Sequence, residues 1–579
     1  MSELARLPYT QGRARVMQVR FGGVDRREGA IDGVIRNMQN LTGENYPILQ
    51  PRRSRKVVGQ IEDCGGIYWH EELLYVSGME LWYAGKLRGH VTAGEKIFCA
   101  MGNRIAIWPD KIIFNASYER QGEYETLEQL KAAVTDPKQF DAYGVGVGVP
   151  YEIYVWDGGA WVSNGLEVEK IEKSTGSNST KFMNGTYEGE DADANTIYCK
   201  GVDFSKYFRV GDAVTISGCT KHPENNKTPI IREIDGGYLR FYENTFVLDG
   251  DKGLTDYTES DVVTFKRTAP DLDGLCANDN RLFGYKDDTI YASALGDPFN
   301  WNKFEGLASD SYFVDAGTPG EFTACVSYLG YPTFFKRERV FKLYGAKPQN
   351  FVLQASAFDG VQEGSGKSLA IVSEVLFYLS DNGARQYTGG MPEDISAPLA
   401  NLKLENAAGG SDGTHWYLSA ENAIGEHELW RYDTLHGSWW HEDEFAVRQF
   451  CRMPQGLLAL EWGTDKLWLL HDEETPERGV RSWAEFADFT DDTLDRKSIE
   501  KIRLRMTLAP HASVAVMIQY DNQLSWNVVA KFDAKDTERS VSVPIMPRRC
   551  DRYRIRIEGE GLWKLHVMAR EVRVKSEKR

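Results

Sequence analysis

The chain has 579 residues, of which 42% are hydrophobic and 26% charged, and its formal net charge is −17. These values describe a globular protein of several domains and exclude a low-complexity or collagen-like chain. No stretch approaches the roughly 18 consecutive apolar residues that cross a membrane. The first residues are polar and basic and lack the apolar core of a signal peptide. We therefore expect no membrane segment.

The charge is unevenly distributed along the chain. Residues 1–56 hold 11 Lys and Arg against 5 Asp and Glu, and residues 496–579 hold 19 against 10, which leaves −32 for residues 57–495. A protein that grips nucleic acid should have a dominant basic surface. The pattern fits an ordinary acidic globular protein, or an acidic body that repels nucleic acid and has basic ends that dock onto something else.

After the basic segment 1–56, strand–turn–strand patterns recur along the chain. They begin near residues 73, 102, 278, 331, 374, 414 and 455. From residue 278 onward they are about 40–53 residues apart, which is the length of a four-stranded propeller blade. The sequence therefore predicts an all-β protein with a β-propeller at residues 57–118 and 269–475.

Residues 119–268 interrupt this spacing, and we expect them to form an inserted, mainly β domain. One short helix is predicted at "YETLEQLKAAV", where Leu127, Leu130 and Val134 follow helical spacing and Thr126 with Gln129 fits a capping box. The alternating stretch after residue 203, with its Gly-Asp and Asp-Gly turns, indicates a small β-barrel or sandwich. Long surface loops tolerate such insertions because loop entropy grows slowly with length.

The turn "ALGDPFNW" at residues 294–301 places two large aromatic residues beside a strand end. Gly296 allows a tight turn, and Pro298 blocks further strand pairing. On an extended segment Phe299 and Trp301 face the same side. We therefore expect Trp301 to be buried against the neighbouring blade and to bind no ligand.

Residues 476–579 alternate between apolar residues and Arg, as in "RYRIRIEGEG" and "IRLRM". A period of two buries one face of a strand and leaves the other face exposed, here a basic one. The sequence predicts a C-terminal antiparallel β-sandwich.

Candidate catalytic motifs are weak. "GVQEGSGKS" at 360–368 has Val361 where a phosphate-binding loop needs Gly, and "GVGVGV" at 144–149 lacks the strand–turn–helix setting of a nucleotide fingerprint. "SDNGARQY" (380–387) and "GSDGTHW" (410–416) do not share the spacing of a repeated Asp box. His436 and His441 are five residues apart and better fit a turn than a metal site. The eight Cys form no C-x-x-C pair. We expect no enzyme activity, no catalytic, cofactor-binding or metal-binding residue, and no cofactor.

Two segments and the order of the domains resemble the tail nozzle proteins of short-tailed bacteriophages, also called stabilisation proteins or tail tubular protein B. The first segment is "GAIDGVIRNMQNLTGENYPILQPRRSR" at 29–55, and the second is "YASALGDPFNW" at 291–301. In the first, the positions that match the family's opening are Asn37, Asn40, Tyr46, Pro47 and Arg52–Arg53. The insertion and the C-terminal sandwich match the family in type rather than residue by residue.

This resemblance implies a structural virion protein of the phage tail, assembled in the cytoplasm of the bacterial host. It implies a homo-oligomeric ring, usually a hexamer, below the portal and adaptor proteins, with tail fibres or spikes attached nearby. Double-stranded DNA would pass through the channel without specific binding. Two alternatives remain open: a carbohydrate-active propeller, either a virion-bound glycosidase or a glycan-binding module, and a cellular propeller that acts as an interaction scaffold.

Overall fold

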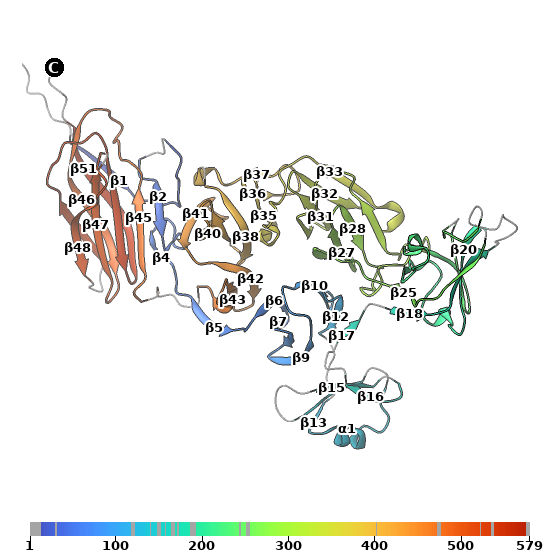
Figure 1. The fold of residues 1–579 in the computed structure, drawn as a ribbon. Helices are drawn as coiled ribbons and strands as arrows, with labels where there is room; N and C mark the ends of the chain where they lie inside the picture. Colours follow the sequence, from blue (N-terminus) through green and yellow to red (C-terminus); the bar gives the residue numbers. More distant parts are fainter. Residues whose placement is uncertain are drawn as a thin grey trace, which may run out of the picture. The chain divides into compact units, whose positions relative to one another are not determined.

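The computed structural model is all-β apart from one short α-helix among the residues it describes (Figure 1). The described residues are 13–28, 32–116, 122–138, 141–146, 152–156, 158–163, 168–170, 173–185, 193–242, 245–250, 255–400, 402–471, 476, 478–521, 523–533 and 538–574. No helix within these ranges is long and apolar enough to cross a membrane. The chain divides into two compact units, one of residues 62–360 and one that joins residues 1–61 to residues 361–579.

Four antiparallel four-stranded sheets belong to the unit 62–360. They consist of β6 (Cys64–His70), β7 (Glu72–Ser77), β8 (Glu80–Tyr83) and β9 (Lys86–His90); β10 (Ile97–Met101), β11 (Arg104–Trp108), β12 (Ile112–Asn115) and β17 (Val168–Lys170); β26 (Gly274–Asn278), β27 (Arg281–Lys286), β28 (Thr289–Ala292) and β29 (Tyr312–Asp315); and β30 (Ala324–Tyr328), β31 (Tyr331–Lys336), β32 (Arg339–Tyr344) and β33 (Val352–Ser356).

Three further four-stranded antiparallel sheets, built from residues 370–469 together with β5 (Lys56–Gln60), belong to the other unit. They consist of β34 (Ala370–Val372), β35 (Val375–Ser380), β36 (Gly383–Tyr387) and β37 (Glu393–Asp394); β38 (Leu404–Ser411), β39 (His415–Asn422), β40 (His427–Asp433) and β41 (Ser438–Asp443); and β42 (Val447–Met453), β43 (Gly456–Glu461), β44 (Lys466–Leu469) and β5 (Lys56–Gln60). Strand β5 comes from the start of the chain and completes the last of these sheets by pairing with β44.

All seven predicted hairpins are present, and each forms the second and third strands of its own sheet. The polar turns between them contain residues with positive φ, such as Lys111, Asp287 and Asp465. Short polar side chains and Gly tolerate this conformation at a tight turn, which explains why the turn pattern was readable from the sequence.

Residues 119–268 hold two separate groups of sheets, and β17 between them belongs to the sheet of β10–β12. The first group contains β13 (Glu123–Tyr124), α1 (Leu127–Ala133), β14 (Ala142–Val145), β15 (Glu152–Trp156) and β16 (Trp161–Ser163). The second contains β18 (Lys173–Ser177), β21 (Thr215–Ser217) and β25 (Val263–Arg267) in one sheet, and β19 (Thr180–Gly185), β20 (Asp193–Cys199), β22 (Ile231–Asp235), β23 (Tyr238–Phe241) and β24 (Tyr257–Glu259) in another. The last two sheets share one hydrophobic core.

The predicted helix is confirmed, with one difference in its cap. The hydroxyl of Thr126 accepts the backbone N–H of Gln129, as a capping box requires. The side chain of Gln129 accepts a backbone N–H from Glu125 rather than from Thr126. Of the three apolar positions, only Leu130 is buried.

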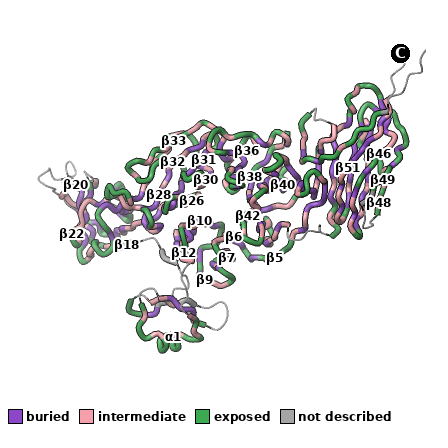
Figure 2. Tube along the Cα trace, turned by 180° about the vertical axis from the view of Figure 1, so that it is seen from behind, coloured by how far each residue is buried: buried purple, intermediate pink, exposed green. Residues whose placement is uncertain are grey.

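Two antiparallel sheets with a common core form the C-terminal region (Figure 2). The first sheet has the order β1 (Arg13–Gln18), β51 (Trp563–Val574), β46 (Lys497–Leu508), β49 (Glu538–Pro544). The second has the order β2 (Ile35–Gln39), β45 (Arg481–Phe486), β50 (Tyr553–Glu560), β47 (Ser513–Tyr520), β48 (Asn527–Asp533). The predicted alternation is observed: on β46, Ile502, Leu504 and Met506 are buried while Arg503 and Arg505 are exposed.

The N-terminal segment differs from its prediction as a basic lead-in to the propeller. Strand β1 pairs with β51 and β2 pairs with β45, so residues 13–39 contribute one strand to each C-terminal sheet. The short pair β3 (Leu41–Thr42) and β4 (Gln50–Pro51) follows, and the chain then enters β5. The composition of β1 does not identify it as a strand. Its partner β51 lies more than 500 residues away, so no local pattern records the pairing.

Candidate functional site

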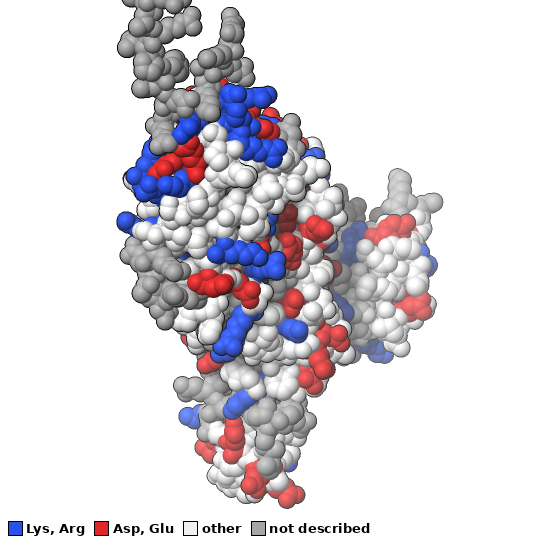
Figure 3. All heavy atoms as spheres, turned by 90° about the vertical axis from the view of Figure 1, so that its left-hand side faces the viewer, with Lys and Arg blue, Asp and Glu red and all other residues white. Residues whose placement is uncertain are grey.

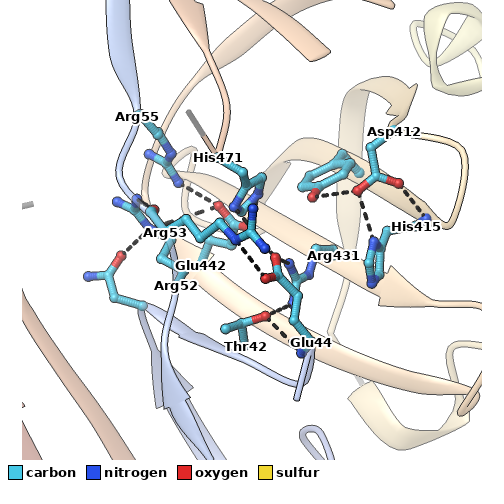
Figure 4. A network of polar contacts seen from close by, with 12 residues as sticks. Thr42, Glu44, Arg52, Arg53, Arg55, Asp412, His415, Arg431, Glu442 and His471 are labelled. Atoms are coloured by element: carbon cyan, nitrogen blue, oxygen red, sulfur yellow. Dashed lines mark hydrogen bonds and ion pairs between the residues drawn. The ribbon is translucent and has the colours of Figure 1, made fainter. Parts of the chain in front are cut away.

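The most concentrated group of buried charges lies where this N-terminal segment crosses the sheet of β38–β41 (Figure 4). Arg52 and Arg55 precede β5, and Glu442 and Asp443 end β41. Isolated charges do not remain buried unless they are paired and hydrogen-bonded. We name this cluster the N-terminal clamp; it consists of Glu44, Arg52, Arg53, Arg55, Arg431, Glu442, Asp443 and His471.

Arg55 makes the closest contacts with the acidic end of β41. Its Nη2 lies 2.8 Å from Oε2 of Glu442, and its Nη1 lies 2.8 Å from Oδ2 of Asp443. A second bond, from Nη2 to Oδ1 of Asp443 at 2.9 Å, makes the Asp443 contact bidentate. Burial alone would lower the pKa of Arg55, but the charges of Asp443 and Glu442 outweigh burial and raise that pKa. The guanidinium therefore stays charged.

Glu442 is the carboxylate at the centre of the clamp, and its side chain is fully buried. Burial acts to raise its pKa, but the charge and hydrogen bond of His471, together with Arg55 and Arg52, hold that pKa well below the ordinary value. His471 Nε2 lies 3.3 Å from Oε1 of Glu442. The carboxylate is thus ionised and is held by two other segments of the chain, residues 52–55 and His471.

Arg431 of β40 forms the second half of the clamp. Its Nη1 lies 3.3 Å from Oε1 of Glu44, and its Nη2 donates to the hydroxyl of Thr42. Arg53 Nε also donates to Glu44, at 2.9 Å. The loop between β3 and β4 is therefore fixed to the middle of a neighbouring sheet by charge-assisted hydrogen bonds.

Asp412 and His415 lie beside the clamp and are joined to it by an aromatic ring. His415 Nδ1 lies 2.8 Å from Oδ2 of Asp412, and the hydroxyl of Tyr417 donates to the same oxygen at 3.1 Å. Burial opposes ionisation of Asp412, but His415 and the backbone N–H groups of the turn hold its pKa below the ordinary value. The ring of Tyr417 lies 5.7 Å from that of His471.

In this arrangement the charged groups are paired with one another. Three carboxylates, Glu44, Glu442 and Asp443, meet the guanidinium groups of Arg52, Arg55 and Arg431. General acid–base work needs a carboxyl group within reach of a substrate and with a pKa near the working pH. Glu442 is buried and its pKa is displaced in the opposite direction. The ion pairs of this cluster attach the N-terminal segment to strands β40 and β41.

Of the motifs in the sequence, "GSDGTHW" supplies Asp412 and His415 beside the clamp, and the others that the structure describes occupy ordinary structural positions. Gly366–Ser368 form a single 3₁₀ turn that leads into β34, and no helix follows it. His436 contacts Asp433 at 2.7 Å, and His441 contacts the carbonyl of Met38 at 3.0 Å. No group of three potential metal ligands occurs among the residues that the structure describes. In "GVGVGV", Gly144 and Val145 lie in β14, and residues 147–149 lie outside the described ranges.

Trp301 occupies the place predicted for it. Only 4% of its surface is exposed, and its ring packs edge-on against Trp108, with the ring centroids 5.8 Å apart. Its indole Nε1 donates to the carbonyl of Pro298 at 3.0 Å. The core around it joins the sheet of β10–β12 to the sheet of β26–β28. The predicted burial is therefore confirmed, and the residue packs between two neighbouring sheets.

In the sequence, Asn40, Arg52 and Arg53 stand out only through the resemblance, and no motif points to Arg55, Arg431, Glu442 or His471. The signal for these residues was weak, since each is an ordinary charged residue in its local sequence. The short spacing of Arg52, Arg53 and Arg55 before an apolar strand was the one local cue.

No family model matches the chain, and no curated protein matches it. Among solved structures, the chain is similar to an exo-β-1,3-galactanase from Phanerochaete chrysosporium, with 11% identity over 51% of this chain and 95% of that chain and a TM-score of 0.20. It is similar to Raptor from Chaetomium thermophilum, with 12% identity over 52% and 29% of the two chains and a TM-score of 0.26. It is also similar to a glycoside hydrolase family 43 arabinoxylan arabinofuranohydrolase from Bacillus subtilis, with 10% identity over 51% and 78% and a TM-score of 0.18. At these TM-scores the similarities carry no argument about this chain.

Proposed function

We propose that the chain is a structural protein of a bacteriophage tail, a nozzle subunit that assembles into a ring around a DNA channel. In this proposal the seven four-stranded sheets are blades of one β-propeller, and the ring lies below the portal and adaptor proteins. The acidic body would let DNA slide through. Phosphate contacts dominate the affinity of proteins for DNA, and acidic side chains repel the phosphates instead of binding them.

The observation that supports the proposal concerns Asn40, Tyr46 and Arg53, three of the residues that match the opening of the nozzle family. Each of them makes a contact that holds the N-terminal segment in place. Asn40 accepts a hydrogen bond from Arg52 and donates one to the carbonyl of Arg481. Tyr46 packs on His436, with the rings 4.4 Å apart, and Arg53 holds Glu44. Residues that match the family's opening thus fasten the N-terminal segment to two other parts of the same unit. Residues 29–31 of that segment lie outside the described ranges.

Electron microscopy of the purified full-length chain tests this proposal. The expected result is a population of closed rings with a central channel, with six subunits as the leading expectation. A chain that stays monomeric over a wide concentration range would contradict the proposal and favour a cellular interaction scaffold. The genes next to this one give an independent check, since a portal, terminase or capsid gene beside it would support a virion protein.

The second candidate is a carbohydrate-active propeller. The four-stranded antiparallel sheets are compatible with such a propeller as well as with a nozzle subunit, so this candidate is tested directly. Incubation with arabinan, xylan and galactan should release no sugar if the chain is a nozzle subunit. Turnover that disappears when one carboxylate is replaced by its amide would establish the second candidate instead.

A further inference from the structure

The outer face of the first C-terminal sheet is basic and includes the exposed apolar side chain of Met17. Strand β46 points Lys501, Arg503 and Arg505 outward. Across the sheet, Arg503 lies opposite Ala569, which lies opposite Met17. Lys501 lies opposite Glu571, which lies opposite Arg15. We call Arg15, Met17, Lys501, Arg503 and Arg505 the basic sheet face.

A carboxylate of the same sheet meets part of this face. Glu571 lies 2.8 Å from Arg503 and 3.9 Å from Lys501, so one carboxylate is shared between two cations. The side chain of Arg503 is 44% exposed, and Met17 is 61% exposed. Figure 3 shows Lys and Arg atoms gathered in the upper part of the view, with Asp and Glu atoms among them.

The same unit carries a second exposed patch of opposite charge. It lies at the turns that join β39 to β40, β41 to β42 and β43 to β44. It consists of Ile424, Glu426, His427, Glu444 and Trp462, named here the acidic turn patch, and the carboxylate of Glu444 also accepts from Gln39. Ile424 is 78% exposed and Trp462 is 55% exposed. The ring of Trp462 lies 6.2 Å from that of His427, and its backbone N–H donates to Ala446, two residues after Glu444.

We infer that the basic sheet face of one copy docks on the acidic turn patch of a second copy of this chain. The two surfaces are complementary in charge, since Lys and Arg on one would meet Glu on the other. Both also expose apolar side chains, which can form the centre of an interface with a polar rim. A duplex of nucleic acid would use the Arg side chains but leave Met17 without a partner. Because the two surfaces are different, the contact repeats head to tail and can close into a ring.

This inference rests on the proposed ring and names the surfaces that build it. Charge reversal tests it in the full-length chain. One variant combines Arg503→Glu with Arg505→Glu, and a second combines Glu426→Arg with Glu444→Arg. Light scattering during size-exclusion chromatography then gives the protein concentration at half assembly. Each variant should raise that concentration by at least about tenfold, because like charges then face each other across the contact.

Mixing the two variants provides the decisive arm. The first variant is acidic on both surfaces and the second is basic on both, so each surface of one complements a surface of the other. The equimolar mixture should assemble within about threefold of the unmodified chain, since the paired changes compensate. A variant that merely misfolds would not be rescued by its counterpart. The matched controls are Lys531→Glu, on the other sheet of the sandwich, and Glu363→Arg, and neither should alter assembly.

The outcomes separate this inference from the proposed function. Rings that form unchanged in both charge-reversed variants would overturn the docking surfaces and leave the nozzle proposal standing. Failure of the mixture to assemble would also overturn the inference. A chain that never assembles would overturn both. Loss of binding to a DNA duplex in the Arg-reversed variant, with assembly unchanged, would assign the basic sheet face to nucleic acid instead.

Discussion

Trp301 illustrates how one side chain joins two sheets. Its ring is buried between residues of β10–β12 and residues of β26–β28, and its one polar atom is satisfied by Pro298. Trp301→Ala should therefore destabilise the unit 62–360 by about 3–5 kcal/mol, the usual result of removing a buried aromatic ring. Chemical denaturation monitored by tryptophan fluorescence would measure the loss. Trp301→Phe, which keeps most of the packing, is the control and should lose much less; equal stability of all three proteins would contradict this role.

Glu442 is the residue on which the N-terminal clamp depends most. Glu442→Gln removes the charge but keeps the shape, and leaves Arg55 and Arg52 partly uncompensated in a buried site. Breaking one side of a buried ion pair costs about 3–5 kcal/mol. The free energy of unfolding in urea should fall by that order for Glu442→Gln, while Glu426→Gln, on the exposed turn, should stay within about 0.5 kcal/mol. Similar losses in both variants would show that the clamp contributes no more than surface charge.

The same carboxylate should make stability depend on pH. The pKa of Glu442 is held well below its ordinary value of 4.5 in the folded chain. The unfolded chain therefore takes up the proton first as the pH falls, and acid favours unfolding. The stability difference between the unmodified chain and Glu442→Gln should be full above pH 4.5 and shrink as the pH falls through the folded-state pKa. A difference that stays constant from pH 7 to pH 3 would exclude this titration.

At the scale of elements, the N-terminal segment links sheets that are remote in sequence. Strand β1 covers the edge of β51, β2 extends the sheet of β45, and β5 completes the sheet of β42–β44. An uncovered strand edge exposes unpaired N–H and C=O groups. The segment thus protects edges at both ends of its path.

Deletion of residues 1–18 tests the first of these contacts. Without β1, those residues of 568–573 whose N–H groups face β1 rather than β46 lose their partners, so their hydrogen exchange should accelerate. Mass spectrometry of exchanged peptides would measure this, with β47 at residues 513–520 as the internal reference, since β48 and β50 pair with it on both sides. Unchanged exchange at 568–573 would mean that β1 contributes little to the order of the edge.

These elements also show what the sequence could and could not predict. The hairpins were predictable because turn chemistry and apolar alternation are local, and Trp301 was predictable because Pro298 and Gly296 fixed its turn. Strand β1, the strand β17 that returns to an earlier sheet, and the clamp at Glu442 were not. Each of them depends on a partner far along the chain, and local composition does not record such pairings.

At the scale of the whole molecule, basic and acidic residues lie on different surfaces, and this predicts how assembly depends on ionic strength. The basic sheet face and the acidic turn patch are both exposed, so their attraction is screened as ionic strength rises, with a Debye length of about 10 Å at 0.1 M and 3 Å at 1 M. The concentration at half assembly should therefore rise steadily from 0.05 M to 0.5 M NaCl in light-scattering measurements. In the mixture of the two charge-reversed variants the same slope should return, because the same number of opposite charges meet. An assembly that strengthens with salt would instead point to a contact dominated by apolar burial, with Met17, Ile424 and Trp462 contributing more than the charges around them.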